Sequence, residues 1–191
     1  LERRNNNMLG NFNEEAQTVL MNAKKEMLDL GHPYIGTEHL LLSILNTDSN
    51  ITERLNNYDL YYDNFKEELS KVVGTSKKKS EYFLYTPLLR KVIESAIMDS
   101  KDNNDGEVTI EHLFFSMLEE GEGIAIRILI GMDIDIESMY DDFSTSLIKK
   151  SKKNKKKRGL SDSERGLSCD YTTLRRCIGK WQRKRRRKMC R

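Results

Sequence analysis

Residues 31–45 read GHPYIGTEHLLLSIL. A Gly-His-Pro turn is followed by Gly-Thr-Glu-His and then by an apolar run of helical length. Three interpretations of the Thr-Glu-His triplet are open: a metal site, a catalytic pair, or the start of a helix. The third has a physical reason, because Thr caps helices and Glu suits the positive end of the helix dipole.

The same pattern recurs later in the chain. With a shift of 73 residues, the segment 38–40 (Glu-His-Leu) falls on the segment 111–113, which is also Glu-His-Leu. Further matches are Phe12 with Tyr85, Val19 with Val92, Ala23 with Ala96, Ser43 with Ser116 and Arg54 with Arg127; after Arg54 the shift becomes 74. Matches spread over about sixty positions indicate an internal duplication.

Each copy reads as four helices. In copy one, apolar residues recur every three or four positions from Ala16 onward, between a capping Asn13 and a terminating Gly31. Thr37 is expected to cap the second helix, and a Thr-Pro pair at 86–87 should start the first helix of copy two. The remaining helices are expected near 38–45, 51–57, 61–73, 110–118, 124–130 and 136–148. We therefore predict an all-α fold, an eight-helix globular domain of two four-helix repeats with pseudo-two-fold symmetry.

Charge divides the chain into two parts. Residues 149–191 contain 19 Lys and Arg against 3 Asp and Glu, whereas residues 1–148 contain 14 against 27. We expect a disordered lead at 1–8, one domain at 9–149, and a disordered basic tail at 150–191. Within the domain, repeat 1 covers about 9–73, an exposed linker 74–84, and repeat 2 about 85–149.

Several function classes lack support in the sequence. No G-x-x-x-x-G-K-[ST] phosphate loop occurs, and no apolar window is long enough to cross a membrane. All three cysteines (Cys169, Cys177 and Cys190) lie in the tail at spacings that match no zinc pattern. We therefore expect no metal, no cofactor, no catalytic residues and a cytoplasmic setting.

The duplicated unit resembles a known family. The segments FNEEAQTVL, GHPYIGTEHLLLSIL, YTPLLRKVIESA and EGEGIAIRIL closely resemble the Clp N-terminal domain, most of all the N-domain of ClpC-type AAA+ unfoldases. Copy two departs from the family pattern: Thr109 and Ile110 precede its Glu-His pair, and its Gly-His turn is lost.

The resemblance implies a non-catalytic domain. In that family the N-domain sits on a hexameric ATP-driven unfoldase, works with the Clp peptidase in proteolysis and the stress response, and receives adaptor proteins and tagged substrates. In ClpC-type proteins it is also linked to proteins marked by arginine phosphorylation, with one pocket per repeat. An ATPase and a peptidase would be partners only if this sequence belongs to a longer chain.

The residues supply a physical case for phosphoarginine binding. A fixed carboxylate, from Glu38 or Glu111, can accept guanidinium N–H groups. A helix start, at Asn13 or Thr86, can hold phosphoryl oxygens on its unpaired N–H groups. The alternative interpretation is that these residues only suit helix starts, and that His39 and His112 make buried hydrogen bonds that tie the two-fold together.

Two further alternatives stay open. The aromatic residues Phe12, Phe83 and Tyr85 flank the repeat starts, where they either bind partner proteins or close the core. The chain could also be a stand-alone regulator with the same fold, whose basic tail binds nucleic acid or another polyanion by charge. That tail is the only part of the chain suited to nucleic acid.

Overall fold

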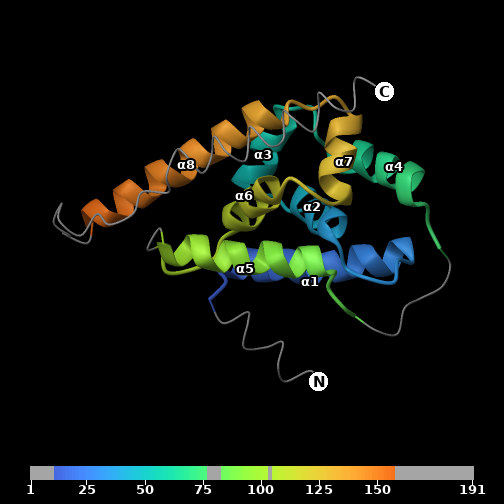
Figure 1. The fold of residues 1–191 in the computed structure, drawn as a ribbon, viewed down its shortest axis with the longest axis horizontal. Helices are drawn as coiled ribbons and strands as arrows, with labels where there is room; N and C mark the ends of the chain where they lie inside the picture. Colours follow the sequence, from blue (N-terminus) through green and yellow to red (C-terminus); the bar gives the residue numbers. More distant parts are fainter. Residues whose placement is uncertain (1–10, 77–82, 103–104, 158–191) are drawn as a thin grey trace.

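The computed structural model describes residues 11–76, 83–102 and 105–157, and for residues 148–157 it describes the helical backbone. The expected eight helices are present in this part of the chain (Figure 1). They are α1 Glu14–Leu30, α2 Thr37–Leu45, α3 Asn50–Asn56, α4 Tyr62–Val73, α5 Pro87–Asp102, α6 Ile110–Glu120, α7 Ile124–Gly131 and α8 Ile136–Lys157. The predicted all-α double repeat is therefore confirmed.

Helix α8 differs from its predicted extent. It was expected to stop at Ile148, before the basic tail, but it continues to Lys157. Lysine has a good helix propensity, so a basic run can prolong a helix that packing has already started. The predicted lead at 1–8 and the tail from 158 onward lie outside the described residues, as do residues 77–82 of the linker.

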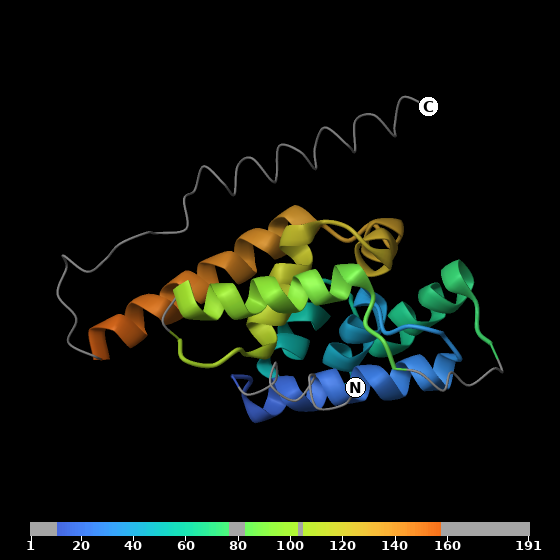
Figure 2. The same cartoon turned by 60° about the horizontal axis from the view of Figure 1, so that its bottom comes forward.

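The two copies pack in the same way and share one core. Helix α1 packs on α2 and α5 packs on α6, while α2 and α4 contact α7 across the repeat boundary. Helices α1 and α5 run along one side of the molecule and α8 along the opposite side (Figure 1). In the turned view, α1 and α8 lie on opposite sides with α5 drawn between them (Figure 2). The buried apolar residues of both copies form one continuous cluster, so neither repeat has a separate core. No helix in the described ranges is long and apolar enough to cross a membrane.

The end of α1 depends on a glycine. Gly31 has φ 68° and ends the helix with its N–H bonded to the Leu28 carbonyl. A Cβ at this position would collide with the Ser76 carbonyl, because Ser76 donates its N–H to the Leu30 carbonyl (2.9 Å) and holds the linker against the turn. The turn therefore requires both a left-handed backbone and an absent side chain.

We expect Gly31→Ala to lower the free energy of unfolding by about 1–3 kcal/mol, from backbone strain and the collision with Ser76. The measurement is urea unfolding followed by helical circular dichroism. Gly131→Ala is the matched control, because nothing lies within 4 Å of a Cβ at that helical glycine. A loss no larger than that of the control would contradict the role given to this turn.

Candidate functional site

The start of α5 is bound to the turn that precedes α2. The N–H of Thr86 donates to the Ile35 carbonyl, and the N–H of Ile35 donates to the Leu84 carbonyl, both at 2.9 Å. Pro87 begins the helix as predicted, and the Thr86 hydroxyl accepts from the N–H of Leu89 (3.2 Å). A helix start from copy two is thus fixed beside the Glu38 segment of copy one.

The start of α1 makes the symmetry-related contacts. The N–H of Asn13 donates to the Val108 carbonyl (3.0 Å), and the N–H of Val108 donates to the Asn11 carbonyl (2.7 Å). The Asn13 side chain caps its own helix by accepting from Ala16 N (2.9 Å). This helix start therefore lies beside the segment that leads to Glu111.

These contacts place each helix start beside the glutamate segment of the other copy. The elements of each candidate site therefore come from both copies. The sequence shows that the two copies are equivalent, but an internal repeat does not reveal whether equivalent parts meet within a copy or between copies.

Glu38 lies in the first turn of α2 and is 5% exposed. Its carboxylate folds back over Gly36, where an added Cβ would strike both carboxylate oxygens. Burial raises the pKa of Glu38, while its own backbone N–H, His32 and the Thr37 hydroxyl oppose the rise. Helix α2 begins at Thr37 with Gly36 as the N-cap, so the prediction that Thr37 caps the helix was wrong by one residue.

The first turns of α2, α5 and α7 meet at Gly123. This glycine has φ 102°, and a Cβ here would contact the Thr37 hydroxyl and the Leu88 side chain at 2.7 Å. An open hollow lies at the start of α5, and its lining is mostly apolar. Its lining residues are Tyr34, Leu84, Tyr85, Thr86, Pro87 and Arg90; Glu38 is not among them.

Glu111 is also 5% exposed, but a cation already contacts it. Arg54 Nη1 lies 3.9 Å from Glu111 Oε1, and Nη2 lies 3.7 Å from Asp142 Oδ2. The same guanidinium lies over the ring of Phe143, 3.9 Å from its centroid. Among the described residues, no Lys or Arg forms a salt bridge with Glu38.

His39 has the structural role that the helix-start interpretation predicts. Its Nδ1 accepts from the N–H of Gly36 (2.9 Å), so the proton of the neutral ring lies on Nε2 and points at His32 Nδ1, 2.8 Å away. His32 Nε2 in turn donates to the Gly74 carbonyl (2.9 Å). Burial lowers the pKa of His39 to about 3, so its 3.3 Å contact with the Glu38 carboxylate is not an ion pair.

His112 repeats this cap in copy two. Its Nδ1 accepts from the N–H of Thr109 (3.1 Å), and its Nε2 donates to Asp105 Oδ2 (3.2 Å). Asp105 occupies the position equivalent to His32. Both histidines make buried hydrogen bonds as predicted, but each bonds to the turn of its own copy and does not tie the two-fold together.

The cluster of His32, Glu38 and His39 is close enough to be considered as a metal site. However, each ring nitrogen of the two histidines takes part in a hydrogen bond. The 2.8 Å separation of His32 Nδ1 and His39 Nε2 is also shorter than two nitrogens on one zinc ion require, given bonds of about 2.0–2.1 Å and tetrahedral angles. This geometry fits a hydrogen-bond chain better than a metal site.

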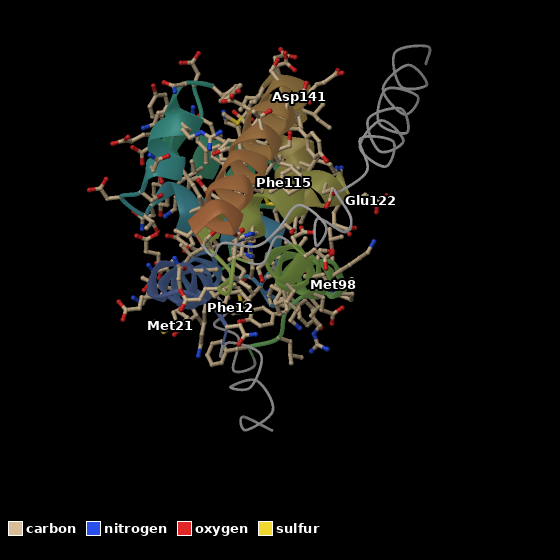
Figure 3. All side chains as sticks on the ribbon, turned by 90° about the vertical axis from the view of Figure 1, so that its left-hand side faces the viewer. Phe12, Met21, Met98, Phe115, Glu122 and Asp141 are labelled. Atoms are coloured by element: carbon tan, nitrogen blue, oxygen red, sulfur yellow. The ribbon has the colours of Figure 1, made fainter. Side chains whose placement is uncertain are left out.

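The three aromatic residues at the repeat starts have different surroundings. Phe12 is 4% exposed and belongs to the core, in the place between α1 and α5 where Figure 3 labels it. Tyr85 is half-buried against the hollow, and burial raises the pKa of its hydroxyl. Phe83 is 40% exposed, with Lys24 Nζ 3.5 Å from its ring centroid. Phe12 therefore closes the core, whereas Phe83 and Tyr85 remain on the surface beside the site.

The sequence prediction missed two residues with charged side chains at these sites, Arg54 and Arg90. The repeat alignment had matched Arg54 with Arg127, which marked the position but not its contact with Glu111. Arg90 lies one turn into α5, in the hollow, and Gln17 occupies the same position in α1. Comparing charges between the copies would have found this difference.

Comparison with known proteins places the chain in a family. The family model described as the Clp repeat N-terminal domain matches residues 11–113 and 84–167. The negative regulator of genetic competence ClpC/MecB of Bacillus subtilis is 34% identical over 130 residues, and the chaperone protein ClpB of Oceanobacillus iheyensis is 33% identical over 130. Each alignment covers 68% of this chain and 16% of the relative, so the chain spans about a sixth of the length of these proteins.

Solved structures show the same fold. The N-terminal domain of the chaperone ClpD from Arabidopsis thaliana superposes with a TM-score of 0.61 at 19% identity, covering 72% of this chain and 97% of that one. The ClpV N-domain in complex with a VipB peptide gives 0.56 at 20% identity, covering 74% and 89%. The family model, the curated relatives and the fold agree, and this chain belongs to the Clp N-terminal domain family.

Proposed function

We propose that this domain recruits proteins to a Clp-type ATP-driven unfoldase by binding adaptor proteins and substrate polypeptides. The family membership supports this role, and one solved structure with this fold is a complex of the ClpV N-domain with a VipB peptide. The exposed Tyr34, Phe83 and Leu84 beside the hollow supply an apolar surface suited to a polypeptide. A longer chain, or a separate ATPase, would supply the unfolding activity.

We further propose that the Glu38 site accepts an arginine-phosphorylated side chain. The observation that carries this proposal is a buried carboxylate without a Lys or Arg salt bridge to any described residue, fixed beside the start of a helix from the other copy. The carboxylate would accept N–H groups of the guanidino head through charge-assisted hydrogen bonds. The α5 start and Arg90 would attract the phosphoryl oxygens, although Pro87 removes one N–H donor.

We expect free phosphoarginine to bind the full chain, and Glu38→Gln to weaken binding by about 10- to 100-fold, because hydrogen bonds to a charged group are worth about 1.5–3 kcal/mol. Calorimetric titration at neutral pH measures this. Glu94→Gln is the matched control, since Glu94 is exposed on α5 and the substitution changes the net charge by the same amount. Unmodified arginine serves as the ligand control.

The pH dependence gives a second measure of the same contact. The guanidino head needs an ionised carboxylate, and burial raises the pKa of Glu38 in the free protein. Affinity should therefore fall on acidification at a higher pH than an ordinary glutamate would give, and binding should release protons at pH values where part of the Glu38 population is protonated in the free protein. Equal binding by the parent and Glu38→Gln would exclude the Glu38 contact, and no binding by the parent would exclude the ligand; both results leave the recruitment of adaptors possible.

The alternative, a stand-alone regulator that binds a polyanion, depends on the basic tail. Residues 158–191 lie outside the described part of the chain, and the described body is acidic. Of this tail the structure describes residues 150–157, the lysine-rich end of α8, and a run of lysines alone does not distinguish a polyanion site from a solvated helix end. The cytoplasmic location also stays a prediction.

A further inference from the structure

The duplication provides an internal comparison between two carboxylates in equivalent positions. Glu38 and Glu111 both lie in the first turn of a helix, both are 5% exposed, and both are followed by a histidine that caps the helix. The copies differ in the cations and anions around these two carboxylates. This difference in surrounding charges decides which of the two carboxylates can accept a ligand.

At Glu111, the chain supplies its own guanidinium group. Arg54 reaches from α3 of copy one to Glu111 and Asp142 of copy two, and it lies over the Phe143 ring. The side chain of Arg54 is 21% exposed, so solvent screens these contacts only in part. At 3.9 Å the contact with Glu111 is a charge contact longer than a hydrogen bond, but it places the same chemical group there that a phosphoarginine ligand would bring.

At Glu38, the equivalent arginine does not make these contacts. Arg127 is exposed and forms no salt bridge with a described residue. The partners of Arg54 are also replaced in copy one: with the shift of 74, Glu68 stands for Asp142 and Leu69 for Phe143. Glu68 is paired with Lys71 (2.8 Å), and leucine offers no aromatic face to hold a cation.

The charges at the two helix starts also favour a phosphoryl group beside Glu38 over one beside Glu111. The start of α1, beside Glu111, has Glu14 and Glu15 in its first turn. The start of α5, beside Glu38, has no acidic residue in its first turn and has Arg90 just beyond it. A phosphoryl group would be repelled at the first helix start and attracted at the second.

We propose that Arg54 acts as an internal guanidinium ligand that closes the Glu111 site, so that the domain binds one phosphoarginine, at Glu38. Arg54 is then a residue that determines ligand stoichiometry, and the two sites of the duplicated fold have taken different roles. The number of bound ligands rests on the proposed function, because it assumes that phosphoarginine is the ligand. The interaction between Arg54 and Glu111 rests only on the contacts of Arg54.

The first experiment titrates phosphoarginine into the full chain and five variants. We expect one equivalent to bind the parent, Glu111→Gln to leave this binding unchanged, and Glu38→Gln to weaken it by the 10- to 100-fold expected above. In the Glu38→Gln background, adding Arg54→Met should open the Glu111 site and increase binding. This binding should stay weaker than that of the parent, because Glu14 and Glu15 remain at the α1 start. Adding Glu111→Gln as a third change should remove the increase. Arg127→Met in the Glu38→Gln background is the matched control and should give no increase.

Two equivalents in the parent, or no increase in binding with Arg54→Met, would overturn the proposal while leaving phosphoarginine binding intact. If the parent binds no phosphoarginine, the proposed ligand fails and a second measurement decides the role of Arg54. This is a double-mutant cycle on the melting temperature. Arg54→Met and Glu111→Gln together should lower it by less than the sum of the single shifts, whereas Arg127→Met and Glu38→Gln should be additive. Additive shifts in melting temperature for both pairs would overturn the proposal that Arg54 interacts with Glu111.

Discussion

Replacing Phe114 with alanine is expected to lower the free energy of unfolding by about 3–5 kcal/mol. Phe114 is fully buried in α6, and its ring centroid lies 4.7 Å from that of Phe143 in α8. The substitution removes apolar surface and leaves a cavity that close-packed neighbours fill only in part. Because both repeats contribute to one core, the loss should appear in a single unfolding transition of the whole domain.

Urea unfolding followed by circular dichroism at 222 nm measures this effect. Met98→Ala is the control, because Met98 is 63% exposed on α5 and its truncation should change stability by less than about 0.5 kcal/mol. Figure 3 shows Met98 on the outer side of the helix. Two separate transitions in either protein would contradict a shared core.

The second large effect concerns pH and His39. Burial, and after it the neighbouring His32, lowers the pKa of His39 to about 3, whereas an unfolded histidine titrates near 6.5. Between these values the unfolded chain binds the extra proton and the folded chain does not. The contribution of His39 is therefore complete above about pH 6.5 and is lost as the pH falls towards 3, by a total on the order of 4 kcal/mol.

His39→Gln should remove this dependence and keep the cap. Glutamine at the third helical position can accept from the Gly36 N–H in a capping box, but it has no proton to gain in this range. We expect the parent to lose stability relative to His39→Gln on acidification from pH 6.5. The raised pKa values of Glu38 and Glu119 act in the opposite direction, but both groups are present in the two proteins and cancel in the difference. Parallel stability curves from urea unfolding at each pH would refute this assignment.

The sequence was sufficient to predict most of the fold. Hydrophobic periodicity, Asn13, Gly31 and Thr86-Pro87 act locally, and each marks a helix boundary that the structure contains. The end of α8 was missed because charge predicted disorder, whereas a helix can continue through lysines once its first turns are packed. The cap at Gly36 was missed because the acceptor is His39, three residues later.

The residues of the candidate site could be selected from the sequence, but their contacts could not. Repetition selected Glu38 and Glu111, and helix-start chemistry selected Asn13 and Thr86; their role in binding stays a prediction. The pairing between copies depends on the hydrogen bonds of Ile35 and Val108, whose apolar side chains reveal nothing about their backbone partners. The contact from Arg54 to Glu111 joins residues far apart in sequence and depends on how α3 packs.

The exchange of hydrogen bonds between copies also constrains how such a domain can have arisen. A dimer of one unduplicated repeat, joined through the same Ile35- and Val108-type contacts, would already contain both sites. Its symmetry would make those sites identical, since every substitution would appear in both subunits. Fusion into one chain removes that constraint, and it allows one arginine to contact a glutamate across the boundary while its counterpart extends into solvent.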